Sequence, residues 1–398
     1  MRAEKMNMPA RIALIAVAAV LFGCSTPPKC GAQCGEAVTS ATPAKAQNPL
    51  KVAVYADAGP GGIGAVEWFR LVNESPEMEL YLVDGKMVRA GALKGLDVIV
   101  MPGGSSKTEF DTLGTNGVER LKDFLRNGGG YIGTCAGCCL LMDGPEKRAR
   151  IMPWNTAGAV GATLFPTFDV NAKGAAALGI KEGQHVMRYH GGPCLWPTTN
   201  VIADAKMEIW GTYHAEANMK GRVEQKKKMF GAGALVGGTY GKGRVFVTSA
   251  HPEYFNSTLY VVKGAFKYVT GRDVTFPARK RNFGAINVGF VSGGISGVDT
   301  AQTAIDIDAA PDLDLVPIDI DAIRQRRVEH LDVVILTNGN LGNNKKYARE
   351  YATIREFAAK GGKVLGFKEG SKILPPGGIK CGTGQDAVKA IRSLFPAK

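Results

Sequence analysis

The chain has 398 residues and a formal net charge of +13, with 45% hydrophobic and 21% charged residues. This composition is typical of ordinary globular domains, and the length is sufficient for two of them. The densest basic runs, Lys226–Lys228 and Arg279–Arg281, come without a recognition motif for nucleic acid. We therefore expect no nucleic-acid partner.

The first 23 residues have the pattern of a secretory signal. Three basic residues precede an apolar run at 12–23, which is too short to span a bilayer. Its end, Leu21-Phe22-Gly23-Cys24, resembles the bacterial lipoprotein signal, and this resemblance implies acylation of Cys24 and an outer-membrane destination. We expect a lipid-anchored cell-envelope protein that faces the periplasm or the surface. Ordinary signal cleavage, with Cys24 left unmodified, is the alternative.

Residues 24–49 are rich in Ser, Thr, Ala and Pro and have no hydrophobic period, which predicts a flexible tether. Cys30 and Cys34 in this tether could form a disulfide in an oxidising compartment, or stay unpaired.

A first domain is expected at 50–271. Apolar runs at 51–56, 78–83 and 97–101 predict strands, and the patterns at 65–72 and 116–128 predict helices. Strands that alternate with helices indicate an α/β domain with a doubly wound, mostly parallel sheet. Its functional site is then expected at the carboxyl ends of the strands.

One such strand is followed by Gly133-Thr134-Cys135-Ala136-Gly137. The pattern predicts a strand, a very tight turn with Cys135 at the bend, and a helix. Glycine is needed on both sides because side chains there would clash with the adjoining elements. A sulfur at a helix N-terminus is also favoured as thiolate, the nucleophilic form.

A second motif, His251-Pro252-Glu253, follows the strand-like segment 243–247. His251 can act as a general base, and Glu253 can orient its imidazole. Together with Cys135 they supply the nucleophile, base and orienting group that covalent acyl transfer requires.

The two motifs in this order resemble the class I glutamine amidotransferase superfamily. The segments Tyr55–Gly62 and Tyr189–Pro193 are most similar to the amidotransferase-like domain at the N-terminus of some biotin-protein ligases. The resemblance covers about 50–271 and implies a flavodoxin-like fold. It also implies backbone oxyanion donors at Gly103 or Gly104 and at Ala136. The substrate-binding residues that it implies are Gly59, Gly61, Tyr189, His190, Gly191 and Gly192.

Other histidines and cysteines give no metal signal. His185, His190 and His214 lack the spacing of known metal motifs, so satisfied structural histidines are expected, with no metal and no cofactor. Cys194 and Cys381 are predicted to be small buried apolar residues.

The remainder, 282–398, repeats the first domain in shortened form. Residues 286–297 resemble 50–64, residues 331–339 resemble 96–104, and residues 355–366 resemble 122–133. Three matched segments in order predict a second, truncated copy of the same fold. Lys368 stands at the nucleophile position and no His-x-Glu follows, so this copy is predicted to be non-catalytic. It would pack on the first domain, complete a pocket or bind a partner.

These observations favour a cysteine hydrolase that cleaves an amide C–N bond of a small-molecule or peptide substrate through a thioester. Two alternatives stay open. One is a ligand-binding or partner-binding module in which Cys135, His251 and Glu253 are relics. The other is thiol–disulfide exchange through Cys135 and Cys138, which stand as C-x-x-C at a helix start. The pairing of Cys30, Cys34, Cys138 and Cys139 also stays open.

Overall fold

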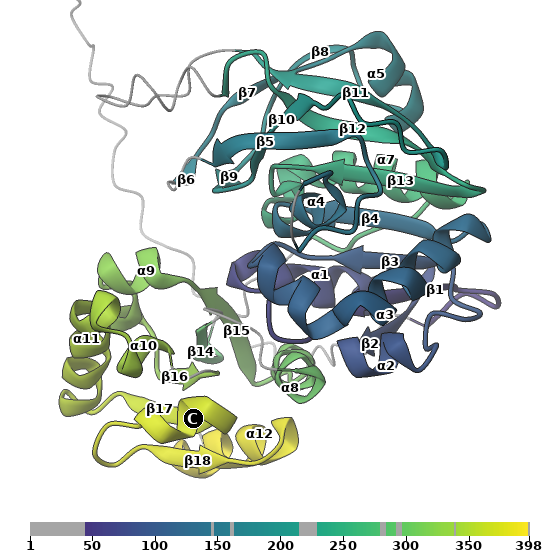
Figure 1. Cartoon of the computed structure of the whole chain (residues 1–398). Coiled ribbons are helices and arrows are strands. Elements are labelled where there is room, and N and C mark those ends of the chain that lie inside the picture. Colours follow the sequence, from purple (N-terminus) through teal and green to yellow (C-terminus); the bar gives the residue numbers. More distant parts are fainter. Residues whose placement is uncertain are drawn as a thin grey trace, which may run out of the picture. The chain divides into compact units, whose positions relative to one another are not determined.

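A computed structural model describes residues 44–144, 147–159, 163–214, 229–278, 284–291, 297–337 and 340–396 (Figure 1). The predicted signal, Cys24 and the tether cysteines Cys30 and Cys34 lie outside these ranges. Within them, no helix combines the length and the apolar character needed to cross a membrane.

The first sheet has a parallel half and an antiparallel half. Its main path runs β2-β1-β3-β4-β13-β12-β11-β7-β8. The first five are parallel neighbours: β2 (Met78–Val83), β1 (Leu50–Tyr55), β3 (Val98–Met101), β4 (Gly130–Thr134) and β13 (Gly243–Thr248). The antiparallel strands on this path are β12 (Gly233–Tyr240), β11 (Ala205–Tyr213), β7 (Thr167–Val170) and β8 (Gly183–Val186). Off the path, β10 (Pro193–Pro197) pairs with β12, and β5 (Trp154–Ala159) pairs with β10. A separate ribbon joins β6 (Thr163–Leu164) to β9 (Tyr189–His190).

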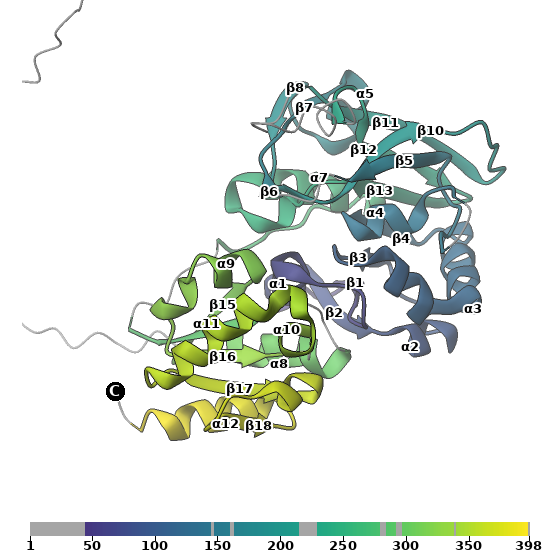
Figure 2. The same cartoon turned by 60° about the vertical axis from the view of Figure 1, so that its left-hand side comes forward.

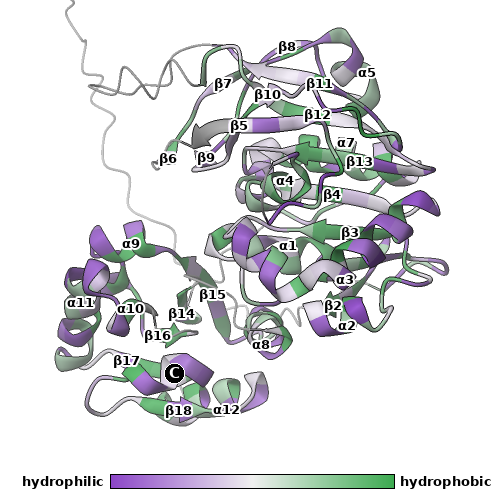
Figure 3. Cartoon of the chain, in the orientation of Figure 1, coloured by the Kyte–Doolittle hydropathy of each residue, from purple (hydrophilic) through white to green (hydrophobic). Residues whose placement is uncertain are grey.

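Helices cover both faces of the parallel half, as predicted. Strands such as β3 are hydrophobic throughout (Figure 3) because alternate side chains enter two separate cores. One core contains α1 (Gly62–Glu74) and α7 (Leu259–Thr270), and the other contains α3 (Ser106–Arg126) and α4 (Ala136–Leu141). The remaining helical segments are α2 (Gly85–Arg89), α5 (Ala172–Leu178), η1 (Pro252–Tyr254) and η2 (Asn256–Thr258).

The helix predicted at 116–128 begins ten residues earlier, at Ser106. The Ser105 side chain accepts a hydrogen bond from the Thr108 backbone N–H and so caps the helix start. Gly114, with φ 62°, interrupts the helix without ending it. The sequence pattern showed only the second half of α3, because the apolar period is regular only after this interruption.

The second sheet runs β15-β14-β16-β17-β18 and is parallel throughout its described strands. These are β15 (Leu313–Ile318), β14 (Ile286–Val291), β16 (Val333–Leu336), β17 (Lys363–Phe367) and β18 (Ile379–Cys381). Helices α8 (Val298–Asp308) and α12 (Gly384–Leu394) cover one face, and α9 (Ile320–Arg324) and α11 (Ala348–Ala359) cover the other (Figure 2). Shorter segments are α10 (Asn340–Asn343), η3 (Arg327–His330), η4 (Lys345–Tyr347) and η5 (Lys368–Ile373). The order repeats β2-β1-β3-β4-β13, which confirms the predicted second copy.

Even the tight turn after the fourth strand is retained in the second copy. Lys368 has φ 42° where Cys135 has φ 51°. A Cβ on Gly370 would lie 2.1 Å from the Leu336 carbonyl oxygen, just as a Cβ on Gly137 would lie 2.2 Å from that of Met101. The second copy has therefore kept the geometry of the turn and replaced its thiol with an ammonium group.

Glu109, in the first turn of α3, is a completely buried carboxyl group. Neither of its oxygens has a hydrogen-bond partner within the described part of the chain. Burial raises the pKa of Glu109 to about 8, although Arg148 opposes the shift. The folded chain thus keeps a proton that the unfolded chain loses near pH 4.5, so this group makes stability fall as pH rises from about 4.5 to about 8.

Glu109→Gln should remove this pH dependence. Between pH 5 and pH 9, the wild type should lose up to about 4 kcal/mol more unfolding free energy than the variant. Urea unfolding at the two pH values measures the difference. Glu119→Gln, on the exposed side of the same helix, is the matched control and should behave as wild type. Equal pH dependence in wild type and Glu109→Gln would contradict the interpretation.

Candidate active site

Cys135 lies at the bend between β4 and α4, with φ 51° and ψ −102°. Its side chain is only 6% exposed. The flanking glycines are needed for close approach, because a Cβ on Gly133 would come within 2.9 Å of Gly137 and one on Gly137 would overlap the Met101 carbonyl. The tight turn predicted from the sequence is therefore present, and it presents the sulfur at the carboxyl edge of the sheet.

His251 and Glu253 meet Cys135 at this edge. The Nδ1 atom of His251 lies 2.8 Å from Oε1 of Glu253, and the Cys135 side chain is close enough to the imidazole to raise its pKa. Because Nδ1 contacts the carboxylate, Nε2 is left for the sulfur. The His251 backbone N–H donates to the Arg188 carbonyl at 2.8 Å, which fixes the start of the turn. The structure thus brings all three predicted catalytic residues together.

His251 is held in its protonated form. Burial alone would lower its pKa, but Glu253 and Cys135 outweigh burial and raise the pKa of His251 to about 9. A raised imidazole pKa stabilises the fold fully below about pH 6.5, and this contribution is lost as pH rises through about 9. At neutral pH the site therefore contains a proton positioned beside the sulfur.

Four residues support this group without having been predicted. Thr134 Oγ1 donates to Glu253 Oε1 at 3.4 Å, and Trp68 Nε1 donates to Thr134 Oγ1 at 3.2 Å. The ring of Tyr254 meets the His251 ring edge-on at 5.2 Å, and the Arg188 guanidinium lies 3.9 Å above the Tyr254 ring. Tyr254 follows the His-Pro-Glu motif directly, which was a usable signal. Trp68 and Arg188 come from remote segments and gave none.

The turn after β3 packs directly against the sulfur and the imidazole. A Cβ on Gly103 would lie 2.6 Å from His251 Cε1 and 3.1 Å from Cys135 Cβ. Gly104 has φ 151° and bridges to Pro60, and Ala136 is the first residue of α4. Of the three predicted oxyanion residues, Gly103 therefore packs against Cys135 and His251, Gly104 follows it in the turn, and Ala136 follows Cys135 at the start of α4.

Gly103→Ala should disable the site while the fold persists. The added methyl group must displace the imidazole, and a displacement of about 1 Å can cost about 10²-fold in rate. The rate at which iodoacetamide modifies Cys135 measures the effect, with the thermal unfolding midpoint as the control for folding. A variant that is folded and reacts at the wild-type rate would place the turn away from the site.

The other predicted binding glycines support this turn. The Ser105 N–H donates to the Gly59 carbonyl, and the Gly61 N–H donates to the Gly103 carbonyl, each at 2.8 Å. Gly59 and Gly61 therefore hold the turn at 103–105 in place from the other side.

The segment Tyr189–Gly192 flanks Cys135 on the opposite side. The carbonyl oxygen of His190 lies 3.5 Å from Cys135 Sγ, and a Cβ on Gly192 would lie 2.0 Å from the Ser249 carbonyl. Gly191 adopts φ 71° between them. The structure corrects the prediction that Tyr189 binds substrate, because its side chain is completely buried and donates a hydrogen bond to the Gly192 carbonyl. It supports the segment from the core and offers no side-chain surface to a substrate.

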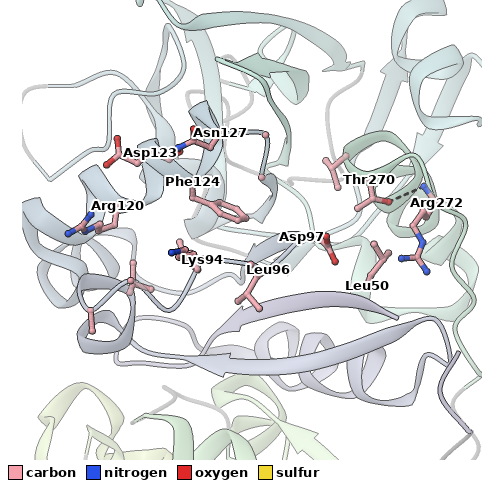
Figure 4. A pocket seen from close by; sticks show the side chains of 18 residues that line it. Leu50, Lys94, Leu96, Asp97, Arg120, Asp123, Phe124, Asn127, Thr270 and Arg272 are labelled. Carbon is pink, nitrogen blue, oxygen red and sulfur yellow. Dashed lines mark hydrogen bonds between the residues drawn. The ribbon is translucent and has the colours of Figure 1, made fainter. Parts of the chain in front are cut away.

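A cavity of about 860 Å³ lies at the other edge of the sheet (Figure 4). Its lining includes Leu50 and Asp97 near the amino ends of β1 and β3, with Arg120, Phe124 and Arg272. None of the predicted site residues lines it. The cavity is therefore separate from the group around Cys135.

The cysteines near the site differ in access. The described cysteines Cys135, Cys138, Cys139, Cys194 and Cys381 form no disulfide with one another. Cys138 is completely buried, and burial raises its pKa well above the ordinary value. Disulfide exchange needs an accessible, ionisable partner, so Cys138 is poorly suited to it. Cys194 and Cys381 are buried, as predicted.

His185, His190 and His214 have structural partners, as predicted. His185 contacts the Tyr260 hydroxyl and the Lys181 carbonyl, and His214 contacts Asp169 and Gln184. His190 contacts Thr163 through Nδ1. In the ranges that the structure covers, no group of three or more His, Cys, Asp or Glu residues is arranged to hold a metal ion.

Comparisons with known proteins match parts of this chain. Residues 75–140 match the model of a family described as biotin-protein ligase, N terminal. A segment of 56 residues is 45% identical to the pyridoxal 5'-phosphate synthase subunit PdxT of Corynebacterium jeikeium (strain K411). The comparisons support the glutamine amidotransferase-like superfamily. The PdxT match covers 14% of this chain and 29% of that protein, so the chain spans less than a third of this relative.

Solved structures with this general resemblance are distant in sequence. A putative ThuA-like protein from Bacteroides uniformis is 12% identical, with a TM-score of 0.40, over 59% of this chain and 97% of that one. PurLQS from Thermotoga maritima is 13% identical, with a TM-score of 0.39, over 55% of this chain and 99% of that one. Scores this low decide neither fold nor function. The fold of this chain follows from its own strand order.

Proposed function

We propose that this chain is a cysteine hydrolase that cleaves an amide C–N bond through a thioester. The observation that supports it most directly is the placement of Cys135 beside His251, whose Nδ1 contacts Glu253 Oε1 at 2.8 Å. The Pro102–Gly104 turn packs against the same two side chains, where an oxyanion would form.

In the proposed reaction, the Cys135 thiolate attacks the carbonyl carbon of the amide. The carbonyl oxygen gains the negative charge, and backbone N–H groups of Gly104 or Gly103 and of Ala136 stabilise it, each for roughly 3 kcal/mol. Collapse of this intermediate breaks the C–N bond, and protonated His251 donates its proton to the leaving nitrogen. Ammonia or an amine departs and the acyl group stays on Cys135 as a thioester.

Water completes the cycle. Neutral His251 takes a proton from a water molecule, and the resulting hydroxide attacks the thioester carbon. The carboxylic acid leaves, and Cys135 and His251 recover the proton they began with. Glu253 keeps the imidazole oriented throughout and stabilises its positive charge.

We further propose that the chain is anchored to the cell envelope through an acylated Cys24, which is supported by the sequence pattern alone. A small-molecule or peptide amide is the proposed substrate. No nucleic acid, metal or cofactor enters this proposal.

Release of ammonia or amine from a panel of glutamine, γ-glutamyl and peptide amides tests the proposal. Hydrolysis should require Cys135, so Cys135→Ala should abolish it, and mass spectrometry should find the acyl adduct on Cys135. Cys381→Ala, a buried cysteine in the second domain, is the matched control and should hydrolyse the same amide at the wild-type rate. Hydrolysis that persists in folded Cys135→Ala, or a wild type that hydrolyses no amide and forms no adduct, would overturn it in favour of a relic site.

A further inference from the structure

The second domain packs on the helix that forms one wall of the site. Residues 40–398 belong to a single compact unit, and one continuous apolar core joins α1 and α7 to α8 and α12. Every residue of α1 from Gly64 to Val72 is buried, including Glu67 and Arg70, which pair with each other. Gly64 in turn packs against Glu253, so α1 connects the two domains to the orienting carboxylate.

Two carboxylates at the start of α9 reach the site from the second domain. Asp319 caps α9 and lies 3.4 Å from Nη2 of Arg188. Asp321, two residues later, accepts a hydrogen bond from Thr163 Oγ1 at 3.3 Å.

The first contact leads to the imidazole. The Arg188 guanidinium stacks on Tyr254, Tyr254 meets His251 edge-on, and the Arg188 carbonyl accepts the His251 N–H. Arg188 is 7% exposed in its side chain, and its Nη1 is buried without a hydrogen-bond partner among the residues described. A buried guanidinium needs a compensating charge, and Asp319 supplies it.

The second contact leads to the sulfur. Thr163 Oγ1 also contacts Nδ1 of His190 at 2.8 Å, and the His190 carbonyl lies 3.5 Å from Cys135 Sγ. The short β6–β9 ribbon that carries Thr163 and His190 has only two pairs of residues, so an outside contact contributes strongly to its position.

We infer that the second domain is part of the active site, and that Asp319 and Asp321 are positioning residues that hold Arg188 and the β6–β9 ribbon against Cys135 and His251. The inference depends on the proposed function only in treating Cys135 and His251 as catalytic. The contacts of Asp319 and Asp321 also predict an effect on the reactivity of Cys135, which can be measured without a substrate. The retained fold of the second copy, without a thiol at its turn, is consistent with such a supporting role.

The test uses the full chain and the rate at which iodoacetamide modifies Cys135 at about pH 7. Asp319→Asn together with Asp321→Asn should lower this rate about tenfold and leave the melting temperature near that of the wild type. A small displacement of reacting groups reduces the reaction rate strongly even where the fold persists. Asp312→Asn is the matched control, since Asp312 pairs with Arg392 within the second domain. It should leave the rate unchanged.

Arg188 variants separate positioning from general destabilisation. Arg188→Met should lower the rate by a similar factor, and adding Asp319→Asn to it should lower the rate no further, because both act through one contact. Arg188→Lys, which keeps the charge, should recover part of the rate. A double Asp variant that reacts within about twofold of wild type would overturn the inference. A wild-type rate that is indifferent to His251→Ala would instead overturn the proposed function, so the two failures are distinguishable.

Discussion

Replacing His251 by alanine is expected to lower the rate of amide hydrolysis by about 10²–10⁴-fold, the usual contribution of a positioned acid and base. Its imidazole contacts the Cys135 sulfur on one side and the Glu253 carboxylate on the other. The pKa of His251, about 9, makes it a proton donor at neutral pH. A chloroketone analogue of glutamine gives a second measure, since it alkylates the same sulfur.

His185→Ala is the matched control for this experiment. His185 is a half-buried histidine that contacts Tyr260 and lies outside the site. The variant should hydrolyse the amide and be labelled at wild-type rates. An equal loss of hydrolysis rate in His185→Ala and His251→Ala would show that removing either histidine destabilises the chain. Hydrolysis at the wild-type rate in both variants would show that His251 takes no part in the reaction.

The second large effect is expected from substitution of Gly137 or Gly370, which occupy the same position of the tight turn in the two copies of the fold. Gly137→Ala and Gly370→Ala introduce the same clash, with a Cβ 2.2 Å from the Met101 carbonyl and 2.1 Å from the Leu336 carbonyl. A backbone carbonyl cannot move out of the way as a flexible side chain can. Each variant should therefore lose about 3 kcal/mol of unfolding free energy, at the upper end of the usual cost of overpacking. Urea unfolding measures both.

The two variants should differ in cysteine chemistry. Gly137→Ala distorts the turn that presents Cys135 and should nearly abolish its modification by iodoacetamide. Gly370→Ala distorts the turn at Lys368, which carries no thiol, and should affect Cys135 far less. If the two variants lost Cys135 reactivity equally at matched stability, the second turn would have to act on the first site directly.

Local sequence signals predicted the fold well. The strand at 97–101, the turn at Cys135 and the alternation of strands with helices follow from apolar runs and paired glycines, because these patterns reflect local backbone needs. The start of α3 was missed, because the apolar period of this helix is regular only after the interruption at Gly114. The duplication was visible because matched segments occur in the same order.

The site was predicted only in part. Cys135, His251 and Glu253 stand in motifs that report their chemistry. Trp68 and Arg188 act through side chains from distant segments, and a tryptophan in a helix or an arginine in a loop looks ordinary along the sequence. Tyr189 was assigned to the substrate because its neighbours resemble a binding segment, although its side chain faces the core.

The reaction of native Cys135 with iodoacetamide at about pH 6, compared with the same residue unfolded in urea, tests the central claim most directly. A cysteine that is paired with a histidine is a stronger nucleophile than one in an unfolded chain. We predict that native Cys135 is modified at least about tenfold faster than unfolded Cys135, and that His251→Ala removes the difference. A native residue that reacts no faster than the unfolded one would contradict an activated nucleophile.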